Sequence, residues 1–443
     1  MSLSMEAIWF VAVFGLCLAG SGMADTDGRW RLVWSDEFDG PAGAGPDPGK
    51  WKCETGGDGW GNNELEYYTG RRENAQLDGK GNLVIEARRE RFKGREFTSA
   101  RLNTAGLFSR KWGRFEARIS LPTGRGFWPA FWMLGDSAGT AGWPVCGEID
   151  IMEHVGKQPG EVYGTIHGPC YSGMDGLGAT CRLPAGDRFS GDFHVFGIEW
   201  NPDGIRWFVD GKEYGTHSPS ELGERVWVFD AQFFIILNLA VGGGWPGSPD
   251  GTTVFPQTML VDWVRVYENR TPAGPAKVRH PGAAPVIPAV RVPGTIEAEY
   301  FDAGGESAGY HDTDSFNQGC RFRMSEGVDI EPCEDIEGGW DIGWTKTGEW
   351  LRYTATVTAS GRYRLAARVA SEGPGGTWHL EVAGRNVTGP MKVPDTGGWQ
   401  KWWTVSCPGL MLDAGTCVFR LVMDGAGPSG SVGNFNRIEL IRD

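Results

Sequence analysis

The stretch of the sequence with the clearest chemical potential is GEIDIMEHVG, residues 147–156. In a β-strand, side chains two residues apart share a face, so Glu148 and Asp150 would point the same way while their apolar neighbours point into a core. Glu153 has the wrong parity for that face. One extra residue at Ile151-Met152, a β-bulge, would restore it. The spacing therefore predicts three carboxylates on one strand face.

Glycoside hydrolysis with retention of configuration is the chemistry that needs such a set. One carboxylate attacks the anomeric carbon, and a second, about 5–5.5 Å away, donates and then accepts a proton. A third carboxylate between them can hydrogen-bond the nucleophile and keep the two charge states distinct.

Two other interpretations of these carboxylates compete with catalysis. A calcium cluster is one, but the loop pattern of a calcium site is missing. A solvated strand face is the other, because alternate polar positions are common on antiparallel strands. The aromatic residues nearby favour catalysis: FWPAFW at 127–132, Trp143 and Trp245 offer more flat apolar surface than one core readily absorbs. A single tryptophan of this group would more often belong to a core.

The composition limits the class of protein. The chain has 443 residues, 40% of them hydrophobic, and a net charge of −14. It can therefore bury real cores, and its charge argues against a nucleic-acid surface or an anionic-membrane surface. The 69 glycines indicate many turns, and the 21 tryptophans require flat apolar partners.

The N-terminus resembles a secretion signal. Residues 7–20 form an uncharged apolar run of 14, too short to span a bilayer, and small residues precede Asp25 at a plausible cleavage site. We therefore expect residues 1–24 to be a signal peptide and the mature protein to be secreted, extracellular and soluble.

Eight of the nine cysteines remain after this leader. An even number in a secreted chain favours disulfides over a metal site. Proximity in sequence suggests the pairs Cys170–Cys181, Cys320–Cys333, Cys407–Cys417 and Cys53–Cys146. Eight cysteines allow 105 connectivities, so the pairing stays open.

A proline-rich stretch divides the mature chain. Residues 269–294 contain six prolines and no periodic pattern, as in an extended spacer. Short alternating or β-branched segments separated by Asp-Gly turns recur on both sides of it. We therefore expect two all-β sandwiches, in residues 27–268 and 295–443.

The first domain resembles glycoside hydrolase family 16 enzymes of the laminarinase type. The matching stretches are WSDEFDG (34–40), WGNNELEYYT (60–69), GRFEARISLPTGRGFWPAFWML (113–134), WPVCGEIDIMEHVG (143–156), YGTIHG (163–168), FFIILNLAVGGGWPG (233–247) and VDWVRVY (261–267). The resemblance implies a β-jelly-roll sandwich and an endo-β-1,3-glucanase. The bulged motif is typical of the laminarinases, whereas the lichenase branch lacks the extra residue.

The resemblance also implies roles for individual residues. Glu148 would be the nucleophile, Asp150 its helper and Glu153 the acid/base. The substrate contacts of the family match Asn63, Trp128, Trp132, Trp143, His167 and Trp245. Arg125 lies in the same cleft-forming stretch, with no role assigned by the resemblance. Many relatives carry a structural calcium ion, whose ligands would match Glu37, the Gly81 carbonyl and Asp262; no cofactor is expected for catalysis.

The second domain resembles a family 6 carbohydrate-binding module, a smaller β-sandwich. The matching stretches are IEAEYFD (296–302), DIGWTKTGEWLRYTATV (341–357), GGWQKWWTVSCPGLML (397–412) and SVGNFNRIELI (431–441). The sugar site of the family would correspond to Trp344, Trp402 and Asn434, with Trp403 as a rival for Trp402. Arg437 replaces a usual aromatic residue. Glu297 and Glu299 match a family calcium site, or else a solvated edge strand.

The two resemblances together predict a secreted, monomeric β-glucan hydrolase.

 A monomer should suffice for such a reaction, with a β-glucan polysaccharide as partner and neither nucleic acid nor membrane involved. The expected activity is hydrolysis of β-1,3-glucan with retention by a two-carboxylate double displacement. The alternatives are a hydrolase of the same fold acting on mixed-linked β-1,3-1,4-glucan or a galactan, a transglycosylase, and a non-catalytic β-glucan-binding lectin. The paired glutamates argue against the lectin.

Overall fold

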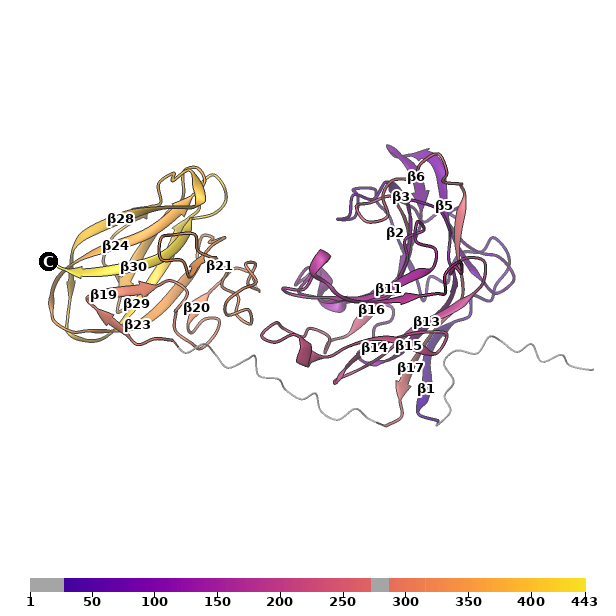
Figure 1. Ribbon diagram of the computed structural model, residues 1–443, viewed down its shortest axis with the longest axis horizontal. Coiled ribbons are helices and arrows are strands. Elements are labelled where there is room, and N and C mark those ends of the chain that lie inside the picture. The colour runs from indigo at the N-terminus through magenta and orange to yellow at the C-terminus, as the bar shows by residue number, and fades with distance from the viewer. Residues whose placement is uncertain (1–27, 272–286, 315) are drawn as a thin grey trace, which may run out of the picture.

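The computed structural model describes residues 28–271, 287–314 and 316–443, which form two β-sandwiches (Figure 1). The predicted signal peptide lies outside the described residues, as does most of the proline-rich stretch. Each sandwich has its own apolar core. No helix in the described ranges is long and apolar enough to cross a membrane.

The first sandwich is a jelly roll of two antiparallel sheets, as the resemblance implied. In the described part its larger sheet has ten strands, in the order β15 (Lys212–His217), β14 (Gly204–Val209), β13 (His194–Asn201), β8 (Gly113–Ser120), β17 (Gln257–Asn269), β5 (Leu83–Phe92), β6 (Arg95–Ser99) and β3 (Glu66–Tyr68), with β1 (Trp30–Asp36) on β17 and β4 (Ala75–Leu77) on β5. Only the β3–β6 pair is parallel among these.

The smaller sheet of this sandwich carries the acidic motif. Its seven described strands follow the order β12 (Leu177–Arg182), β11 (Glu161–His167), β10 (Glu148–Glu153), β9 (Phe127–Gly135), β16 (Phe233–Val241), β7 (Arg101–Asn103) and β2 (Lys52–Glu54). Strand β10 lies between β9 and β11, so its polar face is flanked on both sides. Short 3-10 turns occur at Asp136–Gly139, Gly173–Asp175 and Pro219–Glu221.

The second sandwich also has two sheets in the described part. Seven strands form one: β18 (Val290–Val292), β23 (Trp350–Val357), β29 (Gly415–Gly425), β25 (Thr377–Val382) and β26 (Arg385–Asn386), with β20 (Tyr310–His311) on β23 and β27 (Met391–Lys392) on β25. Six form the other: β21 (Ile330–Pro332), β22 (Trp340–Ile342), β30 (Asn434–Arg442), β24 (Gly361–Ser371) and β28 (Gly398–Leu412), with β19 (Gly294–Glu297) on β30.

The second sandwich begins earlier than the sequence indicated. Strand β18 lies inside the stretch expected to be spacer, and it pairs in parallel with β23. Its Val-Arg-Val alternation buries Val292 in the core of the module. The valine pattern therefore outweighs the prolines on either side of it.

The predicted disulfide pairs are wrong. Cys170 is bonded to Cys320, which lies in the other domain, and the other six cysteines of the described ranges are free: Cys53, Cys146, Cys181, Cys333, Cys407 and Cys417. Proximity in sequence fails here because strands separate the neighbours. Cys181 pairs with Val162 near the start of β11, whereas Cys170 follows the end of β11. Cys407 and Cys417 lie on β28 and β29, which belong to different sheets.

Candidate functional site

Strand β10 contains the predicted bulge. Asp150 is opposite Trp132 of β9, but Met152 is opposite Phe131, so one residue of β10 is extra. The register with β11 shifts at the same place, between Asp150 and Glu153. Ile149 and Ile151 are fully buried in the core. The bulge thus corrects the parity of Glu153, as the sequence predicted.

Each of the three carboxyls has a different ring as its neighbour. Trp143 Nε1 donates to Glu148 Oε2 at 2.6 Å, and Trp128 Nε1 donates to Glu153 Oε1 at 3.0 Å. His167 Nε2 lies 3.2 Å from Asp150 Oδ2. The three groups are therefore chemically distinct although they come from one short strand.

Burial raises the pKa of all three carboxyls. For Glu148, burial and then the charge of Asp150 raise the pKa to about 8, and burial raises the pKa of Asp150 to about 7. For Glu153, burial and then the charges of Asp150 and Glu148 raise the pKa well above its usual range. Glu148 and Asp150 therefore raise the cost of carrying two charges side by side on this strand face. Burial and the two neighbouring charges therefore favour the protonated form of Glu153.

A residue of the opposite sheet also holds the backbone of Asp150. Its side chain is almost fully buried, and its backbone oxygen accepts a hydrogen bond from Trp207 Nε1 at 2.8 Å. Trp207 belongs to β14 of the opposite sheet and is fully buried. The core of the sandwich therefore holds the bulged strand in place.

A hydrogen-bonded chain that the sequence analysis missed supports Trp132. Trp132 Nε1 donates to Asn238 Oδ1 at 2.7 Å, Asn238 Nδ2 donates to Tyr68 OH at 3.1 Å, and Tyr68 OH donates to Glu64 Oε2 at 2.9 Å. Glu64, Glu66 and Tyr68 alternate along the NNELEYY stretch. That alternation was a usable sign that they share a face.

Arg101 is a second residue that the sequence analysis missed. Its guanidinium carbon lies 4.7 Å from the ring centroid of Trp60 and 4.7 Å from that of Trp132. Arg101 also forms an ion pair with Glu54 at 2.5 Å. Cation–π contacts on both rings hold the Trp132 indole by its face, while Asn238 holds it by its edge.

The segment that carries Asn63 is joined to the one that carries Trp245. Leu65 N donates to Val241 O at 2.8 Å, and Val241 N donates to Glu66 Oε2 at 2.6 Å. Val241 ends β16, directly before the VGGGWPG loop. Asn63 itself is exposed and has a left-handed backbone, with φ of 59°.

Trp245 stands against Trp128 and Tyr163, with ring centroids 5.6 Å and 4.9 Å away. Since Trp128 binds Glu153, this aromatic group adjoins the acid/base candidate. On the other side, the Trp143 ring lies 6.3 Å from that of His167 and is 51% exposed. Arg125 donates a hydrogen bond to Ser248 O and forms an ion pair with Asp250. Its observed contacts are therefore to the loop after Trp245.

The strand register brings the expected calcium ligands into one region. Val261 is opposite Leu83, which places Asp262 near the Gly81 turn, and Asp36 is opposite Val264, which places Glu37 nearby. Both carboxylates are engaged by arginines: Arg265 binds Glu37 at 3.0 and 2.7 Å, and Arg118 binds Asp262 at 2.5 Å. The donor types suit calcium, and a bound ion would compete with these arginines.

The residues of the expected sugar site of the module differ in their exposure and contacts. Asn434 is buried, and its Nδ2 donates to Glu331 Oε1 at 2.8 Å and Asp341 Oδ1 at 3.1 Å. Trp344 is 41% exposed, with φ of 48°. Trp402 is half-buried, and its rival Trp403 is the more exposed of the two.

The two carboxylates that match a calcium site of the module family, Glu297 and Glu299, do not both lie on a solvated edge. Glu299 is buried, and burial raises its pKa to about 7. Glu297 is opposite Arg437 on β30, and Arg437 pairs with Glu337 at 3.0 Å. A solvated edge therefore describes Glu299 poorly.

Two family models match the chain. One, Glycosyl hydrolases family 16, covers residues 63–265, and the other, Carbohydrate binding module (family 6), covers residues 318–442. The two matches fall on the two sandwiches.

Three known proteins illustrate the similarity. A beta-glucanase of Rhodothermus marinus is 49% identical, over 58% of this chain and 91% of its own. The clotting factor G alpha subunit of Tachypleus tridentatus is 31% identical, over 88% of this chain and 73% of its own. The crystal structure of the laminarinase catalytic domain from Thermotoga maritima is 51% identical, with a TM-score of 0.52, and the match covers 54% of this chain and 99% of that one.

Proposed function

The chain belongs to glycosyl hydrolases family 16, and we propose that it is an endo-β-1,3-glucanase that cleaves its substrate with retention. The observation that carries the proposal is the environment of the three carboxyls on β10. Trp143 donates to Glu148, and Trp128 donates to a Glu153 that burial and two neighbouring charges keep protonated. A nucleophile and an acid are thereby present together.

In the first step, a Glu148 oxygen attacks the anomeric carbon while the bond from that carbon to the glycosidic oxygen breaks. Glu153 gives its proton to the departing oxygen and becomes a carboxylate. Asp150, on the same strand face as Glu148, helps to orient the attacking carboxylate. The product of this step is a glycosyl ester on Glu148.

In the second step, Glu153 takes a proton from water, and the water oxygen attacks the same carbon. The ester bond breaks, Glu148 leaves as a carboxylate, and Glu153 is again protonated. Two inversions give net retention. No cofactor takes part in this chemistry.

The aromatic groups on either side of β10 supply the sugar contacts in this proposal. Trp143 is exposed beside Glu148, and Trp245 adjoins Trp128 beside Glu153. Flat indole faces suit the axial C–H surface of glucose rings, and Trp132 is held rigidly for the same purpose. The family 6 module would keep the enzyme on the polymer and raise the local substrate concentration.

Secretion belongs to the proposal as well. It is supported by the apolar run at residues 7–20 and by the disulfide between Cys170 and Cys320, because disulfides persist in oxidising compartments. A structural calcium ion at Glu37, the Gly81 carbonyl and Asp262 is a further part, supported by the strand register of the segments that carry these residues.

The experiment that tests the function is product analysis with laminarin, mixed-linked glucan and agarose, for the wild type and Glu153→Ala. We expect short β-1,3-oligosaccharides from laminarin whose new ends are initially of β configuration by NMR, and far less product from Glu153→Ala. Initially α ends would contradict retention. Release from mixed-linked glucan alone would change the substrate to the β-1,3-1,4 polymer.

A β-glucan lectin is the second candidate. A beta-1,3-glucan-binding protein of Penaeus monodon, 35% identical over 37% of this chain and 51% of its own, favours it. The product analysis described above also distinguishes the hydrolase from the lectin. A lectin would bind laminarin and release no product from any of the three polymers.

A further inference from the structure

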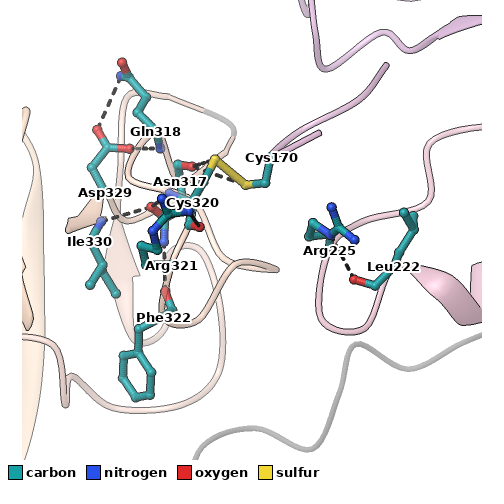
Figure 2. The surroundings of a disulfide bond; sticks show 10 residues. All are labelled: Cys170, Leu222, Arg225, Asn317, Gln318, Cys320, Arg321, Phe322, Asp329 and Ile330. Carbon is teal, nitrogen blue, oxygen red and sulfur yellow. Dashed lines mark hydrogen bonds between the residues drawn. A yellow bond between two sulfur atoms is a disulfide. The ribbon is translucent and has the colours of Figure 1, made fainter. Parts of the chain in front are cut away.

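A covalent link joins the two domains at one point. The Cys170–Cys320 disulfide connects residues 150 positions apart, with Cα atoms separated by 5.1 Å, and Figure 2 shows Cys170 reaching the module from the catalytic domain. In Figure 1, β20 and β21 lie on the side of the module that faces the catalytic domain. The link therefore restricts where the module can lie relative to the catalytic strand β10.

The backbone at both cysteines favours glycine. Cys170 has φ of 68° and Cys320 has φ of 52°. This left-handed region disfavours any residue with a Cβ atom, and glycine adopts it freely. Each domain therefore has a cysteine at a backbone position that is unfavourable for it, and cysteine is the residue type that can form this covalent link.

On the catalytic side, the link starts beside the candidate nucleophile. Strand β11 ends at His167, three residues before Cys170, and His167 lies against Asp150 and Trp143. The turn itself is rigid: Gly168 and Tyr171 exchange backbone hydrogen bonds of 3.1 and 3.0 Å, and the fully buried Tyr171 donates to Val226 O at 2.8 Å. The position of Cys170 is thus fixed relative to the Trp143 side of the site.

On the module side, hydrogen bonds connect the loop of Cys320 to the segment of the exposed Trp344. Cys320 N donates to Asn317 Oδ1, which also accepts from Ile330 N at the start of β21 (Figure 2). In the same loop, Gln318 N donates to Asp329 Oδ1 at 2.6 Å. Gly343 N, directly before Trp344, donates to Asp329 O at 3.0 Å. Asp329 therefore holds both the Cys320 loop and the Trp344 segment.

We propose that the Cys170–Cys320 link joins the Trp143 side of the catalytic site and the Trp344 surface of the module into one extended binding site for a single β-glucan chain. This inference rests on the proposed function, since it concerns the same substrate. Two exposed indoles at fixed positions offer faces for sugar rings of the same chain. Because the link sets the orientation of the domains in advance, the second contact loses little freedom when the chain binds.

The test uses Cys320→Gly, because glycine suits the backbone at this position and the catalytic domain is left untouched. We expect kcat/KM for a long soluble β-1,3-glucan to fall about tenfold, through KM, when the orientation is no longer fixed. A β-1,3-gluco-oligosaccharide of four units should be cleaved at a rate within about twofold of the wild type, since it reaches only one of the two surfaces. Equal kcat/KM values on the long glucan would overturn the proposal.

Two further variants separate the link from other effects. Cys407→Ser removes a free cysteine of the module and should behave as the wild type on both substrates. Trp344→Ala should weaken use of the long glucan in the wild type and do so much less in the Cys320→Gly background, because the two changes break the same contact. Identical effects of Trp344→Ala in both backgrounds would show that the module acts independently of the link.

The covalent link and the binding can also be measured without hydrolysis. Peptide mapping under non-reducing conditions should yield a Cys170–Cys320 peptide from the wild type, and two separate thiol peptides would overturn the proposal. If the wild type cleaves neither substrate, the proposed function fails, but calorimetry with the long glucan still tests the link. Binding about tenfold weaker in Cys320→Gly supports the extended site. Equal dissociation constants refute it.

Discussion

The indole nitrogen of Trp143 donates a 2.6 Å hydrogen bond to Oε2 of Glu148. Trp143 stands in the loop before β10, and half of its surface is exposed. Its donor favours the ionised form of Glu148 and so opposes burial, which raises the pKa of that carboxyl. One side chain therefore both offers a face to the substrate and adjusts the charge of the candidate nucleophile.

The first prediction concerns Trp143→Phe, which keeps an aromatic face and removes the donor. The pKa of Glu148 should rise, so the acidic limb of the kcat/KM profile should move to higher pH, by about one unit for a charge-assisted bond of ordinary strength. A pH series on laminarin measures this. Trp132→Phe is the matched control, because the Trp132 indole donates to Asn238 and not to a carboxylate. An acidic limb that stays in place in Trp143→Phe would contradict the role of the donor.

The second prediction concerns Asp150→Asn. After burial, the charge of Asp150 is the largest cause of the raised pKa of Glu153. Neutralising it should lower that pKa, so Glu153 should lose its proton at lower pH and the alkaline limb should move down. We also expect kcat/KM to fall roughly 10- to 100-fold, because an acid/base with a lower pKa carries its proton less often at the working pH. Asp262→Asn, on the other sheet, should leave the alkaline limb unchanged, and an unmoved limb in Asp150→Asn would refute the coupling.

The sequence predicted the local part of the candidate site well. The parity of Glu153 depends only on the two-residue period of a strand, so the bulge at Ile151 could be inferred from spacing. The aromatic residues at 127–132 could also be linked to the acidic motif from the sequence alone. The two segments are close together in the chain and form the paired strands β9 and β10.

The parts that were missed depend on tertiary contacts. The chain from Glu64 through Tyr68 to Asn238 joins segments 170 residues apart in sequence, and no local period predicts such a contact. The predicted disulfide pairs were wrong for the same reason. Cys170 and Cys320 come together only through the placement of two domains, whereas the sequence offered Cys181 and Cys333 as nearer neighbours.

The third prediction concerns Glu66, a fully buried carboxyl whose pKa is raised, first by burial and then by the charge of Glu64. The folded state therefore binds a proton that the unfolded chain releases near pH 4.5. Stability is unaffected below that pH and falls as the pH rises toward the folded pKa. Glu66→Gln removes this penalty, because a neutral amide keeps the acceptor for Val241 N.

We expect Glu66→Gln to raise the free energy of unfolding at pH 7 by about 1–3 kcal/mol and to change it little at pH 4. Urea unfolding at the two pH values measures the difference. Glu66→Leu is the control: it also removes the charge but leaves Val241 N without a side-chain acceptor, so it should destabilise at both. An equal gain from Glu66→Gln at pH 4 and pH 7 would exclude a titration effect.

The fourth prediction concerns Tyr68→Phe, which removes the hydroxyl between Asn238 and Glu64. Two buried polar groups lose a partner, so stability should fall by about 1–3 kcal/mol. Trp132 should become less firmly held, which raises KM for β-1,3-oligosaccharides several-fold and changes kcat little. Steady-state kinetics separate the two parameters. A drop in kcat alone would indicate that Tyr68 acts on the carboxyls of β10 and not on Trp132.

The last prediction tests the calcium proposal. Glu37 and Asp262 are bound by Arg265 and Arg118, and an ion held between these carboxylates would have to displace both arginines. If calcium binds the folded state alone, a concentration 100 times its dissociation constant adds about 2.7 kcal/mol of stability. We therefore expect Tm to rise with added Ca²⁺ and to fall with a chelator. Asp262→Asn should abolish this dependence, whereas Asp413→Asn, at an exposed position of the module, should retain it. A Tm that is the same with Ca²⁺ and with chelator would mean that the two arginines, rather than a metal ion, balance these carboxylates in the working protein.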